Sequence, residues 1–184
     1  NLSPFTELSV FDDQAERVAN LRSQLDDADL YGRVTVHQSA LDDLMLPPYL
    51  AHELFVSPKQ SLALVDNPAS LSRIYESVRP YGGVLCLMTK PDNKSADNKN
   101  SDDVSRIVNA VRAAGLQQAK VETHAWGISV TREGSLPGSG TWTHQYGDVA
   151  NTIKSNDQLV KLPLGVLWYG GVSHEDVLPR HGHG

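Results

Sequence analysis

Hydrophobic positions change their spacing twice within the first 40 residues. The short apolar run from Leu8 to Phe11 predicts a buried strand, and residues 34–37 predict another. Between these runs, apolar residues recur at steps of three and four, which predicts an amphipathic helix. Its apolar stripe consists of Ala15, Val18, Leu21, Leu25 and Ala28. We expect Asp12 or Asp13 to cap this helix and Gly32 to end it.

Strands and helices continue to alternate over the middle of the chain. Residues 38–48 contain two aspartates and two prolines, which predict a loop. Residues 52–57 predict a strand that is fully buried at Leu54 to Val56, and residues 71–78 predict a helix. Its inward-facing residues are expected to be Leu71, Ile74, Tyr75 and Val78. The segment from Arg79 to Gly83 predicts the end of this helix and a turn, because proline restricts the backbone of the preceding residue and glycine permits positive φ.

The pattern closes with an antiparallel hairpin. Residues 84–88 predict a strand, and residues 90–101, which have hardly an apolar side chain, predict a surface loop. A further helix ending near Gly115 is predicted by apolar residues at helical spacing. These residues are Val104, Ile107, Val108, Val111 and Leu116. Residues 120–124 and 128–132 predict the two strands of a hairpin at the sheet edge.

The fold class that this order predicts is α/β. We expect a Rossmann-like, mostly parallel sheet flanked by helices and ending in an antiparallel hairpin, over residues 1–134. Residues 134–140 are rich in glycine, serine and proline, which is typical of a linker, and helical spacing is absent beyond them. Residues 135–184 are therefore expected to form an irregular extended tail. With 50 residues it is too short to build an independent core, so we expect it to pack on the first domain or to continue into a further part of the polypeptide.

Charge and cysteine content exclude some classes of protein. The chain of 184 residues carries 16 basic and 22 acidic side chains, a net charge of −6, and no local basic cluster. We therefore expect no nucleic-acid partner. Cys86, the single cysteine, lies in an apolar run and is expected to be a buried, inert thiol. No apolar stretch approaches the ~20 residues that cross a bilayer, and no signal peptide is visible.

The first predicted strand, helix and strand form a βαβ unit with an acid where its first strand ends. At that place Asp12 can accept hydrogen bonds from both hydroxyls of a ribose. A Gly-rich turn that holds the rest of a cofactor should follow a preceding strand, and only six residues precede Glu7. The plainer interpretation is that Asp12 caps the next helix. The sequence thus indicates a cofactor fold with an incomplete cofactor site.

From about Leu8 to Arg132, this order of elements resembles class I S-adenosylmethionine-dependent methyltransferases that lack the first strand and its Gly-rich loop. The resemblance implies a ribose-side role for Asp12, with Asp13 beside it, and S-adenosylmethionine as the cofactor. It implies an adenine-side role for the loop from Ser39 to Asp43.

That loop includes Ala40 and Leu41. The resemblance implies that Asp42 or Asp43 accepts a hydrogen bond from the exocyclic amine of the adenine. Ser57 takes the place of a substrate-side or catalytic polar residue. The plainer interpretations are that these aspartates are solvated turn residues and that Ser57 shapes the exit of its strand. No catalytic residue is assigned.

The tail carries a second resemblance. Residues 142–152 and 162–171 are similar to the segment that leads into pyrroloquinoline-quinone (PQQ)-type β-propellers, particularly in large planctomycete proteins that join a methyltransferase-like domain to a propeller. The resemblance implies that the chain is a piece of a longer polypeptide and that its location is periplasmic or secreted. Trp142, His144 and Trp168 are expected to be packing anchors of the tail, rather than stacking platforms for a quinone.

The histidines near the end of the chain are weak candidates for metal ligands. His174, His181 and His183 lie near Glu175 and Asp176, and imidazole and carboxylate suit Zn²⁺ or other divalent ions. Their spacing matches no established zinc pattern, so no metal site is expected.

Three functions from different classes follow. The favoured one is a degenerate methyltransferase-like domain that serves as a scaffold or docking module for a PQQ-like β-propeller, which would be its partner. The second is an active methyltransferase, completed by a segment that supplies the first strand. The third is a part of a quinone- or metal-dependent oxidoreductase assembly, in which PQQ or a metal enters through the larger assembly.

Overall fold

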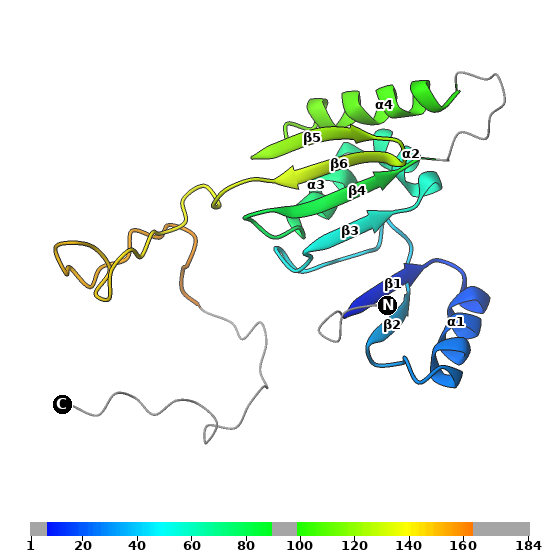
Figure 1. Ribbon diagram of the computed structural model, residues 1–184, viewed down its shortest axis with the longest axis horizontal. Coiled ribbons are helices and arrows are strands. Elements are labelled where there is room, and N and C mark those ends of the chain that lie inside the picture. Colours follow the sequence, from blue (N-terminus) through cyan, green and yellow to red (C-terminus); the bar gives the residue numbers. More distant parts are fainter. Residues whose placement is uncertain (1–6, 90–98, 164–184) are drawn as a thin grey trace. The chain divides into compact units, whose positions relative to one another are not determined.

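The computed structural model describes residues 7–89 and 99–163 (Figure 1). The chain divides into two compact units, residues 1–135 and 136–184. The boundary between these units lies one residue after the domain boundary expected from the sequence, between residues 134 and 135.

The first unit begins with the predicted βαβ segment. Strand β1 (Leu8–Asp12) is followed by helix α1 (Ala15–Asp27) and strand β2 (Val34–Gln38). The two strands pair in parallel, from Leu8 opposite Val34 to Asp12 opposite Gln38. Helix α1 covers the face of this pair on which Val34 and Val36 are buried.

The predicted ends of helix α1 were wrong by a few residues. Its N-cap is Gln14, which makes no side-chain capping hydrogen bond, rather than Asp12 or Asp13. The reason is that Asp12 accepts from the amide of Gln14, two residues on, in a turn that precedes the helix. The helix stops at Asp27, and Gly32, with a φ of 105°, lies in the turn to β2.

The other four strands form one sheet in the order β3-β4-β6-β5. Its strands are β3 (Glu53–Val56), β4 (Gly83–Met88), β5 (Ala119–His124) and β6 (Gly127–Arg132). β3 pairs with β4 in parallel, whereas β4 with β6 and β6 with β5 are antiparallel. The predicted C-terminal hairpin is therefore confirmed, and its strand β5 lies at the sheet edge.

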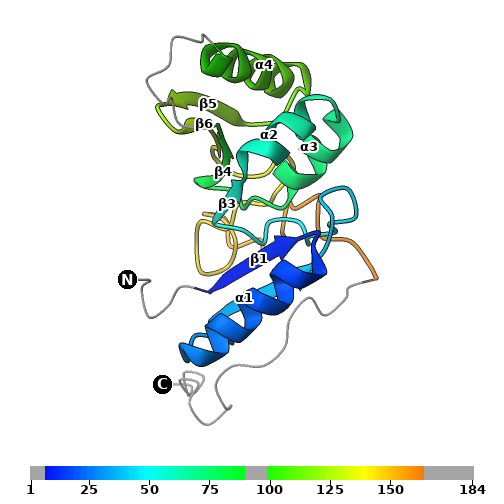
Figure 2. The ribbon, with the colours of Figure 1, turned by 90° about the vertical axis from the view of Figure 1, so that its right-hand side faces the viewer.

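Three helices cover one face of this sheet, as Figure 2 shows. They are α2 (Pro58–Val65), α3 (Pro68–Glu76) and α4 (Lys99–Ala113). The sequence interpretation missed α2 and placed α3 three residues late. Ser57-Pro58 and Asn67-Pro68 place a polar N-cap before a proline at N1, a start signal that was not used. The start of α4 overlaps the last part of the predicted loop 90–101, and residues 90–98 of that loop lie outside the described residues.

The hydrophobic core lies between these helices and the sheet. Its buried residues are Val56, Leu64, Leu71, Ile74, Tyr75, Val78, Leu85, Leu87, Ile107, Val111, Ile128 and Val130. Phe55 is 61% exposed, so the prediction that Leu54 to Val56 are all buried was wrong. Successive strand residues face opposite ways, and Phe55 points away from the helices while its neighbours face them.

Two further residues of the four-stranded sheet, Cys86 and Arg132, are buried. Cys86 is buried as predicted, and burial, followed by the nearby charge of Glu53, raises the pKa of its thiol. Arg132 is also buried: its Nη2 donates to the carbonyl oxygen of Tyr75 at 2.7 Å, and its guanidinium lies 4.2 Å from the centre of the Tyr75 ring. The guanidinium thereby fastens the last strand to α3.

The second unit, as far as residue 163, consists of turns and extended segments without a helix or a strand. Two aspartates organise it. Asp148 accepts from the amides of Ala150 and Thr152, and Asp157 accepts from those of Gly140, Leu159 and Val160.

Among all the residues that the structure describes, no helix is both long and apolar enough to span a membrane.

Candidate functional site

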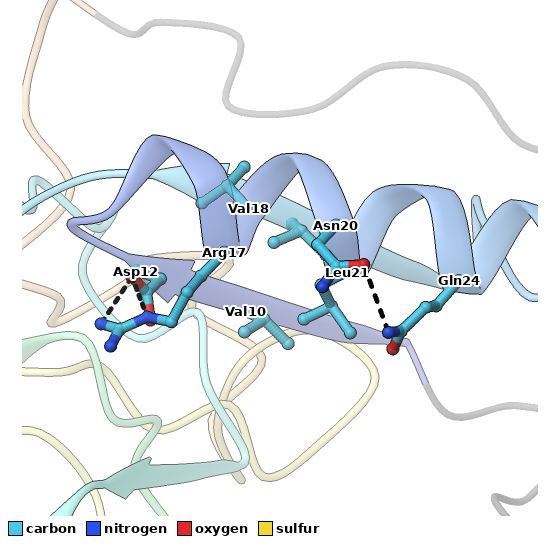
Figure 3. Close-up of a pocket in the computed structure, with 8 residues that line it drawn as sticks. Val10, Asp12, Arg17, Val18, Asn20, Leu21 and Gln24 are labelled. Atoms are coloured by element: carbon cyan, nitrogen blue, oxygen red, sulfur yellow. Dashed lines mark hydrogen bonds and ion pairs between the residues drawn. The ribbon is translucent and has the colours of Figure 1, made fainter.

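Asp12, at the carboxyl end of β1, is held by the first turn of α1 (Figure 3). Arg17 donates from Nε to both carboxylate oxygens, at 3.1 and 3.0 Å, and from Nη2 to Oδ1 at 2.9 Å. The amide of Gln14 donates to the same Oδ1 at 2.8 Å. Asp13 is a weaker partner of the same guanidinium, with Arg17 Nη2 3.2 Å from its Oδ1. One arginine therefore serves both acids of the predicted ribose site.

These contacts fix the charge of Asp12. The Arg17 guanidinium, and next to it the backbone amide of Gln14, hold the pKa of the Asp12 carboxyl below its ordinary value. Asp12 is therefore ionised at neutral pH and acts as an acceptor. The pair is exposed to solvent, with 28% of the Asp12 side chain and 58% of the Arg17 side chain accessible.

In this arrangement the residues beside Asp12 do not fit the ribose of S-adenosylmethionine. A carboxylate that binds both hydroxyls needs free lone pairs on its two oxygens. Here Oδ1 already accepts from Gln14 and Arg17, and Oδ2 accepts once from Arg17.

A hollow of about 280 Å³ opens next to Asp12, between β1 and α1. Its lining is half apolar, from Val10, Val18, Leu21 and Val36. Arg17, Asn20 and Gln24 complete it from the helix, together with Asp12 (Figure 3). The hollow thus combines one charged end with an apolar wall.

The predicted adenine-side loop is tied to helix α3. Asp42 Oδ1 accepts from Asn67 Nδ2 and from Ser70 Oγ, both at 3.1 Å. Arg73 Nη2 donates to the backbone carbonyl of Asp42 at 2.9 Å. In the same loop Leu41 packs against the core of the four-stranded sheet. The carboxylate of Asp42 therefore already anchors the loop.

Two other residues of this loop, Ala40 and Asp43, make local contacts within the loop, and the carbonyl of Ala40 also accepts from Ser39 Oγ at 3.1 Å. Asp43 donates its amide to the carbonyl of Ala40 at 3.2 Å, which closes a turn. Sequence reasoning missed the three residues that hold the loop: Asn67, which caps α3, and Ser70 and Arg73, which lie on it. The signal that could have located them is Asn67-Pro68: Asn67 caps the helix, accepting from the Ser70 amide at 3.2 Å, and still has its own amide hydrogens to donate.

Ser57 is the N-cap residue of α2, and its Oγ donates to Gln60 Oε1 at 2.6 Å. A second hollow, of about 210 Å³, lies nearby and is lined by Pro58, Lys59, Leu62, Thr89 and Asp103. Ser57 is not part of that lining. The observed contact is the one expected of a residue that shapes the start of a helix.

The candidate residues of the tail are separate from this site in the sequence. Trp142 is 56% exposed, and the Nδ1 of His144 lies 2.9 Å from the hydroxyl of Thr143. Trp168, His174, His181 and His183 lie outside the described residues. In the described part of the chain, no group of three potential metal ligands comes together. The anchoring role of the tail residues stays a prediction.

Two solved structures that are similar in fold are described as S-adenosylmethionine-dependent methyltransferases. A SAM-dependent methyltransferase from Aquifex aeolicus is similar over 68% of this chain and 67% of its own, with a TM-score of 0.51 and 16% identity. A putative S-adenosyl-L-methionine-dependent methyltransferase from Methanococcus maripaludis is similar over 69% of this chain and 66% of its own, with a TM-score of 0.54 and 16% identity. No protein-family model and no curated protein matches the chain. At these identities the likeness concerns the fold, and it confirms the Rossmann-like prediction.

Proposed function

We propose that this chain is a methyltransferase-fold domain that does not itself transfer methyl groups and instead serves as a scaffold or docking module. The observation that carries the proposal is the commitment of Asp12 to Arg17 and to the amide of Gln14. In a nucleotide-binding βαβ unit, this carboxylate is the group that holds the ribose. Here it instead closes the first turn of α1.

The ion pair is not a strong lock by itself, because exposed ion pairs contribute little. Removal of Arg17 would free the carboxylate but would not supply the rest of a donor site. The charged methionine part of S-adenosylmethionine needs hydrogen-bond partners next to the ribose carboxylate. Among the described residues around the hollow, Asn20 and Gln24 are bonded to each other at 3.3 Å. Among the described residues, the carboxylate of Asp12 is therefore already engaged, and one donor of Gln24 and the acceptor of Asn20 are engaged with each other.

The docking role extends to the second unit. Val149, Val160 and Leu162 are large apolar side chains that stay exposed in this unit. Exposed apolar side chains such as these are available for contact with a partner. Together with the resemblance of the tail to a propeller-leading segment, this supports attachment to a PQQ-like β-propeller, in a periplasmic or secreted protein.

Isothermal titration with S-adenosylhomocysteine tests the noncatalytic role. We expect no saturable heat up to about 1 mM ligand, which means a Kd above the millimolar range. The variant Arg17→Ala, which frees Asp12, should bind equally poorly. A micromolar Kd for the unaltered chain that is lost in Asp12→Asn would overturn the proposal, because it would show a working ribose carboxylate.

A second candidate function is an active methyltransferase that is complete only in a longer polypeptide. It is favoured by one observation: β1 and β3 each pair on one side only among the described strands. The same titration on the polypeptide extended upstream of residue 1 distinguishes the two candidates. Micromolar binding in the extended polypeptide, lost in Asp12→Asn, would support the active enzyme.

A further inference from the structure

The second hollow lies at the carboxyl end of β4 and is separate from the one beside β1. Its volume is about 210 Å³, and it is lined by Pro58, Lys59 and Leu62 of α2, by Thr89, and by Asp103 of α4. Helices α2 and α4 pack against each other, and α2 contacts β4 (Figure 1). The hollow therefore opens between these two helices, next to the end of the strand.

Thr89 brings a buried hydroxyl without a partner to this hollow. Its amide donates to the carbonyl of Trp126 at 2.9 Å, which extends the β4–β6 ladder by one residue. Since side chains alternate along a strand, Thr89 faces the helices, as Leu85 and Leu87 do. Only 5% of Thr89 is exposed, and its Oγ1 has no hydrogen-bond partner among the described residues. A buried hydroxyl without a partner is costly, and a ligand in the hollow would provide one.

The first turn of α2 supplies the positive side of the hollow. The amides of Lys59 and Gln60 have no acceptor in the described part of the chain, and the N-cap Ser57 makes no side-chain bond to them. The ammonium group of Lys59 makes no ion pair with any residue that the structure describes. The N-terminus of a helix carries a positive partial charge and binds carboxylates and phosphates. This side of the hollow therefore suits a carboxylate.

The wall from α4 is acidic. The ion pair of Asp103 is with Arg106, whose Nη1 lies 3.8 Å from Oδ1, which is longer than a hydrogen bond. No ion pair joins Asp103 to Lys59. An anion in the hollow would be repelled by Asp103, and a cation would be repelled by Lys59. A ligand that carries both charges would satisfy both side chains.

We propose that this hollow binds a small zwitterion of the amino-acid class, with its carboxylate at Lys59 and the start of α2 and its ammonium group at Asp103. The hydroxyl of Thr89 can donate as well as accept, so it would bond to the ligand. Pro58 and Leu62 offer an apolar wall for the carbon atoms. The volume is below the ~300 Å³ of sites for drug-sized ligands and suits a molecule of this size. The inference goes beyond the function proposed above and does not depend on it.

Three ligands with one carbon skeleton test the two charges. L-Leucine carries both, 4-methylpentanoate lacks the ammonium group, and 3-methylbutylamine lacks the carboxylate. In an NMR titration of the 184-residue chain at neutral pH, leucine should bind with a Kd of about 0.1–1 mM. Each analogue should bind at least about 10-fold more weakly, because one charged wall is left without its partner.

Two results of this titration would overturn the proposal. Equal affinity for 4-methylpentanoate and leucine would show a plain anion site. The second result is saturable binding of neither leucine nor the smaller L-alanine up to about 10 mM, which would show that the hollow takes no amino acid.

Substitutions of the two charged residues should change ligand preference in opposite ways. Lys59→Gln should abolish the preference for leucine over 3-methylbutylamine, because the carboxylate then has no charged partner. Asp103→Asn should abolish the preference for leucine over 4-methylpentanoate. Lys120→Gln, on β5, is the matched control and should leave all three affinities unchanged. Equal losses for all three ligands in both variants would contradict the assigned ends of the ligand.

Thr89→Val separates binding from a structural role. Valine has nearly the same shape without the hydroxyl, so the melting temperature should stay the same or rise, while leucine should bind at least about 3-fold more weakly. Thr131→Val, on β6, is the control and should not change the affinity. A Thr89→Val chain that melts several degrees lower would show that the hydroxyl already has a structural partner. An unchanged affinity would show that it does not touch the ligand, and either result would contradict the proposal.

Discussion

The two sheets of the first unit are built from the same kind of sequence but differ in how much covers them. The β1–β2 pair has one helix, and its buried apolar residues are Val18, Val34 and Val36. The four-stranded sheet has three helices and a core of twelve buried residues. Apolar spacing predicted both α1 and α3, yet α1 buries only Val18 while α3 buries Leu71, Ile74 and Tyr75, so the presence of such spacing does not decide how deeply an element is buried.

The difference has an energetic consequence. A two-stranded sheet is marginal by itself and needs packing against further elements. The four-stranded sheet has that packing, and the buried guanidinium of Arg132 also fastens its β6 to α3. We therefore expect the four-stranded layer to set the stability of the domain, and the β1–β2 layer to open more easily.

The largest effect is expected from truncating a leucine in the core. Leu87→Ala should lower the free energy of unfolding by about 2–5 kcal/mol, because Leu87 is fully buried on β4. Leu21→Ala is the matched control on α1, since Leu21 borders the open hollow, and should cost less than about 1 kcal/mol. Urea denaturation measures both values. Equal losses would remove the contrast between the layers.

A smaller effect is expected at Arg132. Arg132→Ala should lower the free energy of unfolding by about 2 kcal/mol, because a buried charged hydrogen bond and a contact with the Tyr75 ring are lost. Arg112→Ala, at an exposed position of α4, should change it by less than about 0.5 kcal/mol. The test is again urea denaturation, and a neutral Arg132→Ala would show that the guanidinium does not fasten the strand.

The link from the β1–β2 layer to α3 should be weaker still. Asp42→Ala removes the acceptor of Asn67 and Ser70 and should cost about 1 kcal/mol. Asp43→Ala removes the neighbouring acid, for which no side-chain partner is found among the described residues, and should be nearly neutral. Thermal unfolding by circular dichroism can compare them. If the two variants melt alike, Asp42 is a solvated turn residue rather than an anchor.

The smallest effect concerns the pH dependence of the β1–α1 turn. Because the pKa of Asp12 is lowered by Arg17 and Gln14, its contribution to stability is present above the ordinary value of 3.8 and is lost as the pH falls through the lower folded value. A carboxyl NMR titration should give Asp12 a midpoint below 3.8. In Arg17→Ala this midpoint should rise, while the bond to Gln14 remains. An unchanged midpoint would mean that Arg17 does not hold the carboxylate.

Periodic spacing predicted most of the elements because it reports local burial. The stripes of α1 and α4 and the alternation of β5 and β6 could be read in this way. Helix α2 was missed because it has eight residues and follows β3 directly, so its apolar positions merge with those of the strand. Phe55 was assigned to the interior because an apolar run does not show which faces of a strand are covered.

The candidate site was predicted less well for a different reason. The position of Asp12 at the end of a strand follows from the order of apolar and acidic residues nearby, and Asp12 is indeed the last residue of β1. Its partner Arg17 lies five residues away on the exposed side of a helix, where spacing carries no information about ion pairs. The bonds of Asp42 to Asn67 and Ser70 join residues 25 and 28 positions apart, and such contacts follow from the tertiary fold.

Native-state hydrogen exchange of the 184-residue chain tests the contrast between the two layers most directly. The account predicts that amides of the β1–β2 ladder exchange at least about 100-fold faster than those of the β4–β6 ladder, because the smaller layer opens without global unfolding. One common opening free energy for both ladders would contradict it.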